Sequence, residues 1–113
     1  MNSIFVISQA YIKANSTNPT FDCNIETRGY YFSFEKAQKF MKLPTDSWWF
    51  EEYYKDINEG NVIYFVIEEI DEGFAPQCKE LQWFKLQIID NVVKPVSCDK
   101  PNELKQLAHF GMS

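Results

Sequence analysis

The sequence predicts an α+β fold: a single domain, residues 1–113, with a mostly antiparallel sheet of four to five strands and two or three helices packed on it. Three observations favour this class. Apolar runs rich in Val, Ile, Tyr and Phe, which are typical of strands, occur near the start and in the second half of the chain. Two segments between them carry apolar residues at helical spacing. Hairpin-length links near the end favour antiparallel neighbours.

The composition also fits one globular domain. Of the 113 residues, 45% are hydrophobic, 24% are charged and 17% are aromatic. A chain of this length buries roughly two thirds of the surface that its unfolded form exposes. The aromatic share is high for a globular domain. Rings that the core does not need often mark a place where another molecule binds.

The first strand is predicted over residues 4–12, IFVISQAYI. Residues 13–27 then switch to Asn, Ser, Thr, Pro and Asp, which indicates the longest loop. A loop of about fifteen residues is at the limit of what compact domains leave unstructured. It is therefore either a mobile binding loop or a piece of irregular strand. A short strand over residues 30–32 follows it.

Two helices are expected in the middle of the chain. Ser33 is a good N-cap for a helix over residues 34–41, which has to end before Pro44 because a residue preceding proline avoids helical angles. A second helix is predicted over residues 45–57, where aromatic and apolar residues recur at helical spacing. Trp48 is the ring least easily buried with the others, and we expect it to be exposed.

Residues 61–70, NVIYFVIEEI, form the longest apolar run and predict the central strand. Alternate side chains of a strand point to opposite faces, so Ile63, Phe65 and Ile67 give one fully apolar face. The residues between them give a second apolar face that turns acidic at Glu68, where we expect the strand to leave the core. A strand that is apolar on both faces belongs inside a sheet.

The last third of the chain predicts a loop, a hairpin and a helix. Residues 71–80 are expected to be a loop and residues 81–89 a strand. Asp90–Asn91 is a plausible two-residue turn into a final arm. Pro95 would confine that arm to a sheet edge or end it early. A short helix is expected over residues 101–110.

Three segments of the chain, IFVISQAY, GYYFSFEKAQKF and YFVIEEIDEGF, are similar to segments of small bacterial α+β domains of unknown function. The resemblance covers residues 4–74. Its most specific element is FS followed by EKA, at the start of the capped helix. The resemblance implies the same order of strand, helix and acidic-ended strand. It implies no catalytic residues, since that family has none assigned.

The sequence gives little support to a catalytic or metal site. The single His, His109, has no partner in the local sequence to orient it as a base or a ligand. Cys23, Cys78 and Cys98 are odd in number and widely separated, which favours reduced thiols over disulfides or a zinc site. Glycine-rich phosphate loops and hydrolase signatures are absent from the sequence. We therefore expect no metal and no cofactor.

The N-terminal segment predicts a cytoplasmic protein. It lacks a basic region, and its apolar run, residues 4–7, is too short for a signal peptide or a membrane span. Reduced cysteines are typical of the same compartment.

Charge is concentrated in one third of the chain. Residues 46–72 hold nine acidic residues and one basic residue, a net charge of −8, whereas the rest of the chain carries +3. Aromatic residues are interleaved with these acids. A surface of this kind repels nucleic acids and anionic membranes, and it attracts a basic protein.

These observations favour a non-enzymatic, acidic protein-binding module of bacterial or phage type. An immunity or inhibitor protein that neutralises a basic partner such as a nuclease is one example. Aromatic anchors dominate interface energies, and acids steer a basic partner toward them. The predicted binding residues are Trp48, Glu51, Glu52, Asp56, Glu68, Glu69, Asp71 and Glu72.

Two alternatives stay open. One is a small hydrolase or ligand-binding enzyme, in which two carboxylates from different segments converge in a concave pocket lined by aromatic rings. Acids on a flat or convex face would argue against it. The other is an auxiliary domain that forms a homodimer through its sheet edge, which a mass in solution would test.

Overall fold

The computed structural model describes residues 3–17, 23–42, 48–73 and 78–104, with the side chains of residues 48–51 outside the description. Its elements are β1 Ser3–Ile12, β2 Asn24–Tyr31, α2 Phe34–Met41, α3 Trp48–Asn58, β3 Val62–Asp71, β4 Cys78–Ile89, β5 Val92–Cys98 and the 3₁₀ helix η1 Asn102–Leu104. The strands form one sheet in the order β2-β1-β3-β4-β5, and every neighbouring pair is antiparallel. The predicted α+β class and its antiparallel sheet are therefore confirmed.

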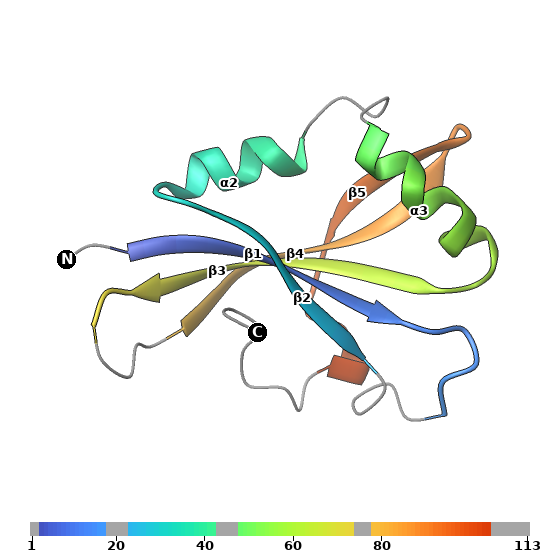
Figure 1. Ribbon diagram of the computed structural model, residues 1–113, viewed down its shortest axis with the longest axis horizontal. Coiled ribbons are helices and arrows are strands. Elements are labelled where there is room, and N and C mark those ends of the chain that lie inside the picture. The colour runs from blue at the N-terminus through green and yellow to red at the C-terminus, as the bar shows by residue number, and fades with distance from the viewer. Residues whose placement is uncertain (1–2, 18–22, 43–47, 74–77, 105–113) are drawn as a thin grey trace.

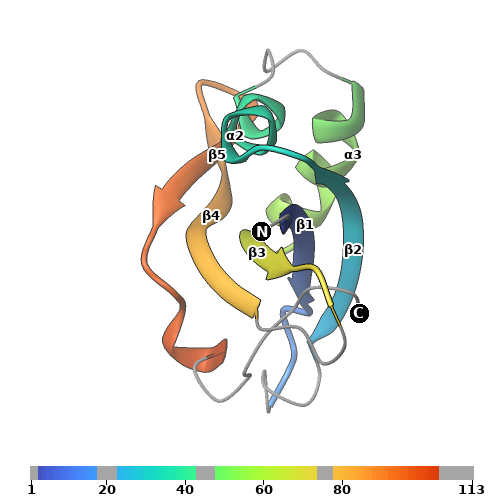
Figure 2. The same cartoon turned by 90° about the vertical axis from the view of Figure 1, so that its left-hand side faces the viewer.

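The two helices lie on one face of the sheet, which we call the helix face (Figure 1). The short η1 lies on the opposite face, where Leu104 is fully buried against Tyr64 and Trp83 (Figure 2). Each face of the sheet carries its own cluster of buried apolar side chains, one under the helices and one under η1. The inner strands therefore need apolar residues on both faces.

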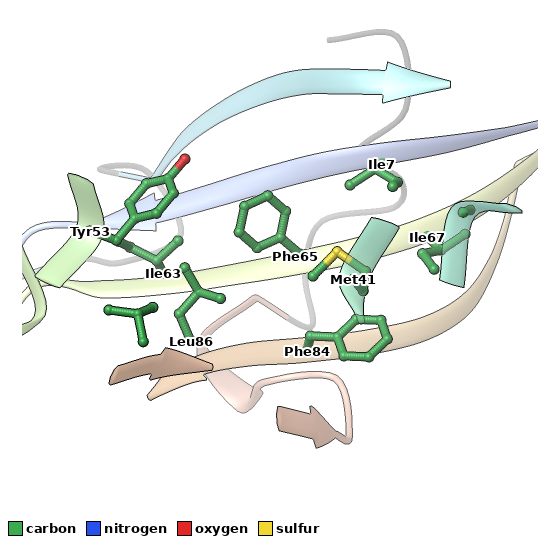
Figure 3. Packing of buried hydrophobic residues seen from close by; sticks show 10 residues of the cluster. Ile7, Met41, Tyr53, Ile63, Phe65, Ile67, Phe84 and Leu86 are labelled. Carbon is green, nitrogen blue, oxygen red and sulfur yellow. The ribbon is translucent and has the colours of Figure 1, made fainter. Parts of the chain in front are cut away.

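The middle strand of the sheet is β3, as the sequence predicts. Ile63, Phe65 and Ile67 face the helices and are completely buried. Phe65 lies at the centre of this cluster, among Tyr53, Met41 and its strand neighbours (Figure 3).

The prediction that β3 leaves the core at Glu68 is wrong. Glu68 has 0% of its surface exposed, and Ile70 has 4%. The reason is that β4 begins at Cys78 and not at Leu81, within the segment predicted to be a loop, so it flanks the end of β3 on one side while β1 flanks it on the other. A register shift between Ile67 and Glu68 accommodates the longer pairing.

The edge strand β2 begins at Asn24, six residues before the predicted strand, and Phe32 follows its end. Of the two alternatives for residues 13–27, the irregular strand therefore applies to Asn24–Thr27. The prediction missed these residues because their polar composition resembles that of a loop. An edge strand can be polar, since only one of its long sides pairs with the sheet and much of it stays in contact with water. The pairing with β1 shifts register after Thr27, which makes Arg28 an extra, bulged residue.

Both helices follow local signals in the sequence. Ser33 caps α2 as predicted, since its hydroxyl accepts a hydrogen bond of 3.2 Å from the backbone N–H of Lys36. Ala37 and Met41 then point into the helix-face core. The second helix is present as α3, and the part of it predicted over residues 45–47 lies outside the described residues.

The predicted hairpin connects β4 and β5. Asp90 and Asn91 have φ values of 53° and 65°, the left-handed conformation that a two-residue hairpin turn of this type needs. Pro95 does not end β5 early, because β5 is the edge strand opposite to β2. Of the helix predicted over residues 101–110, η1 is the described part.

Candidate functional site

Helix α3 is fixed to the sheet by one buried tyrosine. The Tyr53 ring meets Phe65 edge-on, with ring centroids 6.2 Å apart. Its hydroxyl donates a hydrogen bond to Oε1 of Gln9 on β1, and both side chains are buried. This polar contact inside an apolar cluster fixes the orientation of α3 as well as its position. Separating the hydroxyl from the amide where water cannot replace either partner would cost free energy.

Replacing Tyr53 by Phe should lower the free energy of unfolding by about 1–2 kcal/mol, because Gln9 keeps its buried amide but loses this donor. Chemical denaturation followed by fluorescence measures the change. At protein concentrations where the chain is monomeric, Tyr30→Phe is the matched control, since the Tyr30 side chain is 59% exposed and removing its hydroxyl should change the unfolding free energy very little. Equal effects of the two variants would contradict the structural role of the Tyr53 hydroxyl.

Carboxylates surround this attachment point on the side of α3 that faces water. Asp56 accepts a hydrogen bond of 3.1 Å from the Tyr11 hydroxyl. Glu52 and Glu59, one turn before and nearly one turn after it, are exposed. Helix α3, from Glu52 onward, and Glu59, which directly follows it, therefore present three acidic side chains, of which Asp56 is tied to the sheet by a hydrogen bond that positions it.

Glu26 on β2 belongs to the same group of charges. Burial raises the pKa of the Tyr53 hydroxyl; Arg28 opposes the rise, while Glu52, Glu26 and Asp56 add to it. The pKa of Tyr11 is raised in the same way, by burial first and then by Asp56 and Glu59. The Tyr53 hydroxyl thus lies within the electrostatic reach of acids from α3 and β2, and the Tyr11 hydroxyl lies within reach of Asp56 and Glu59. We call the set Glu26, Glu52, Asp56 and Glu59 the α3–β2 acidic surface.

Two ion pairs lie within the α3–β2 acidic surface. Nη1 of Arg28 is 3.2 Å from Oε2 of Glu26, and Nζ of Lys55 is 4.0 Å from Oε1 of Glu59. All four side chains are substantially exposed, so each pair contributes at most about 1 kcal/mol. Pairs this weak leave the carboxylates available to a cationic partner.

The structure places the predicted binding residues in separate groups. Glu52 and Asp56 lie on the α3–β2 acidic surface, and Trp48 and Glu51 lie in α3 with side chains outside the described residues. A second group is at the far end of β3, where Glu69 and Asp71 are half-buried and Glu72 is exposed. Asp71 accepts a hydrogen bond of 3.0 Å from the Ser3 hydroxyl.

These two groups do not form one surface. Asp56 is hydrogen-bonded to Tyr11, which lies opposite Ile63 at one end of the β1–β3 ladder. Asp71 is hydrogen-bonded to Ser3, which lies opposite it at the other end of that ladder. The separation along β3 is about 26 Å at the rise of a strand. Glu68 belongs to neither group, because it is buried on the opposite face.

Sequence reasoning did not select Glu26 or Glu59. Glu26 lies in the segment predicted to be a loop, although the alternation of polar and apolar residues through Asn24, Ile25 and Glu26 is a weak strand signal. Its approach to α3 depends on tertiary structure, which no local pattern contains.

A second polar cluster lies on the opposite face around Glu80. Its Oε1 accepts a hydrogen bond of 2.9 Å from the indole N–H of Trp83, and its Oε2 is 2.9 Å from Nζ of Lys100. Glu80 pairs directly with Glu68 across β3 and β4. Two carboxylates from different segments therefore lie on paired positions beside an aromatic ring, which is one part of what the enzyme alternative requires; the other part is a concave pocket.

The chemistry of this cluster is that of a structural ion pair. Both oxygens of Glu80 have partners within the protein, and Glu68 has no exposed surface through which to reach a substrate. Within the described ranges, no three His, Cys, Asp or Glu side chains are placed to bind a metal ion. The α3–β2 acidic surface is therefore the better candidate for function.

The three cysteines are free and partly buried. Burial raises the pKa of the Cys23 thiol to about 11. Burial also raises the pKa of Cys78, with Glu68 adding to it, and that of Cys98, with Asp99 adding and Lys85 opposing. Thiols with raised pKa values stay protonated at neutral pH, so they are poor nucleophiles. His109 lies outside the described residues.

No family model matches this chain, and neither a curated protein nor a solved structure is significantly similar to it. The resemblance of residues 4–74 to small bacterial domains stays a prediction. Neither α2 nor α3, as far as the structure describes them, has the length and apolar character needed to cross a lipid bilayer.

Proposed function

We propose that this protein is a non-enzymatic protein-binding module that binds a basic protein through the α3–β2 acidic surface. The observation that carries the proposal is the placement of acids from β2 and α3 on one face of the sheet. Glu26 pairs with Gln9, which accepts the hydrogen bond of the Tyr53 hydroxyl, and Asp56 of the same helix accepts the hydrogen bond of the Tyr11 hydroxyl. Acids on a rigid support speed the encounter with a cationic partner and select its orientation.

Charge complementarity supports a basic nuclease as the partner. A basic nuclease carries a cationic groove for phosphates, and an acidic surface can occupy such a groove in place of the nucleic acid. An immunity or inhibitor function of bacterial or phage type would use the surface in this way. The three free thiols support a cytoplasmic location for the complex.

Charge reversal on α3 tests the proposal. The probe is a panel of purified basic bacterial nucleases, titrated by calorimetry at low and high salt. The double variant Glu52→Lys with Glu59→Lys should weaken binding to a panel member by roughly tenfold or more. The matched control, Glu72→Lys with Asp99→Lys, changes the net charge equally at exposed positions away from α3, and it should keep most of the affinity.

Two results would count against the proposal. If both double variants lose affinity equally, net charge and not the α3–β2 acidic surface governs binding. If no member of the panel binds the wild-type chain even at low salt, the choice of partner is wrong.

A further inference from the structure

The two edges of the sheet are protected unequally. On β5, Pro95 lacks a backbone N–H and Lys94 adds a charge, and both residues discourage the pairing of another strand. On β2, which is at the other end of the strand order, neither Pro nor Lys occurs, and its two charged residues, Glu26 and Arg28, form an ion pair with each other. The edge that remains suited to pairing is therefore β2.

An aromatic pair stands at the end of this edge. Tyr30 is 59% exposed and Phe32 is 74% exposed. Their rings meet edge-on, with centroids 5.8 Å apart and an interplanar angle of 83°. Two large rings exposed together next to a sheet edge are the kind of patch that interfaces cover, because aromatic residues contribute most to binding energy there.

The bulge at Arg28 makes β2 complementary to a second copy of itself. Ile25 pairs with Ala10 and Tyr30 with Val6, so both side chains are on the opposite face of the sheet even though they are five residues apart. In an antiparallel β2–β2 pair, this spacing allows Ile25 to lie across from Tyr30 of the second copy, on the same face. The contact occurs twice, once on each side of the symmetry axis.

The charges agree with the same register. It sets Glu26 across from Gly29 of the second copy, next to the second copy's Arg28. Within one chain these charges form an exposed ion pair. Between two copies, each Arg28 can also reach the other Glu26. Asp56 of α3 is hydrogen-bonded to Tyr11, and Tyr11 pairs with Asn24 at the start of β2. In the antiparallel dimer the two α3 helices would therefore lie toward opposite ends of the joined strands, where their acidic side chains would not repel each other.

We propose that two copies of this chain join through their β2 edges into one continuous antiparallel sheet, with Tyr30 packed on Ile25 and Glu26 paired with Arg28 across the axis. The proposal does not depend on the basic partner. Such a dimer would present Glu52, Asp56 and Glu59 of both copies on the same side of the joined sheet, while each Glu26 lies near the symmetry axis.

Sedimentation equilibrium over a concentration range on the order of a hundredfold tests the dimer. Wild type should show the mass of two chains at high concentration. Tyr30→Lys should weaken the dimer by roughly tenfold or more, because it places a charge against Ile25 of the other copy. Ile89→Lys is the matched control: Ile89 is an exposed apolar residue beside the β5 edge, and its replacement should leave the dimer unchanged.

A mixing experiment tests the register. Glu26→Arg alone and Arg28→Glu alone each place like charges across the axis, so each variant should form a weaker dimer than wild type. In an equal mixture of the two variants, one copy carries two positive charges and the other two negative charges. The mixed dimer should therefore regain strength close to that of wild type.

Circular dichroism and thermal melting confirm that each variant is folded before masses are compared. A wild-type chain that stays monomeric over the whole concentration range would overturn the proposal. The proposal would also be overturned if this monomer bound an added extended peptide along β2, since the occupant of the edge would then be a peptide and not a second copy. A dimer that Tyr30→Lys leaves intact, or a mixture no tighter than its components, would overturn the β2 assignment.

Discussion

Replacing Phe65 by Ala is expected to lower the free energy of unfolding by about 3–5 kcal/mol. Phe65 is completely buried on β3, with its ring edge-on to Tyr53, and it pairs with Gln9 on β1 and with Phe84 on β4. Its removal leaves a cavity where three strands and α3 meet. Domains of this size have a total stability of about 5–15 kcal/mol, so the variant should be partly unfolded at 37 °C or close to it.

Denaturant unfolding followed by tryptophan fluorescence measures this loss. At protein concentrations where the chain is monomeric, Phe32→Ala is the matched control, because the same side chain is removed where it is 74% exposed, and its effect should stay within about 0.5 kcal/mol. If Phe65→Ala does not fold, Phe65→Leu keeps most of the volume and should cost less than about 1.5 kcal/mol. Similar losses in the Phe65 and Phe32 variants would mean that the core is centred elsewhere.

Alkaline pH should destabilise the fold, with the largest contributions from one thiol and one phenol. Burial raises the pKa of Cys23 from 9.0 to about 11, and burial with a contribution from Glu103 raises that of Tyr64 from 10.0 to about 12. The unfolded chain therefore releases each proton first. Since the unfolded state then binds fewer protons than the native state, stability falls as pH rises from 9 to 12, and the contributions of both groups are intact below pH 9.

The loss should reach up to about 2–3 kcal/mol for Tyr64 and somewhat less, about 1–2 kcal/mol, for the partly exposed Cys23. Unfolding measured at a series of pH values under reducing conditions shows it. Cys23→Ala should reduce the loss of stability in the lower part of this pH range, and Tyr64→Phe should reduce it in the upper part. A stability that does not fall between pH 9 and pH 12, or variants that keep the wild-type profile, would refute this assignment.

Much of the fold could be predicted because local and tertiary preferences agree. The apolar faces of β3, the Ser33 cap and the Asp90–Asn91 turn all follow from residues close together in sequence. Tertiary pairing decided the rest. Glu68 is acidic and was predicted to be exposed, yet the early start of β4 buries it.

The candidate site was harder to predict than the fold. A net charge can be counted along a sequence, but whether acids share a surface depends on the strands between them. The ladder of β1 with β3 separates Asp56 from Asp71. The ladder of β1 with β2 places Glu26 beside Gln9, to which Tyr53 of α3 is hydrogen-bonded. The partners of Glu80 come from positions three and twenty residues away, and the second of these leaves no local pattern.

The pairing of β1 with β3 also has a consequence for how the chain is made. The two strands join residues as far apart as Ser3 and Asp71. Ribosomes add about 5–20 residues per second, so the finished β1 has to wait roughly 3–12 s until the last residue of β3 is made. During that time β1, a strand of ten residues of which six are buried in the finished domain, has β2 as its sole neighbouring strand. The polar composition of β2 then keeps a hairpin of two strands in solution until the third arrives.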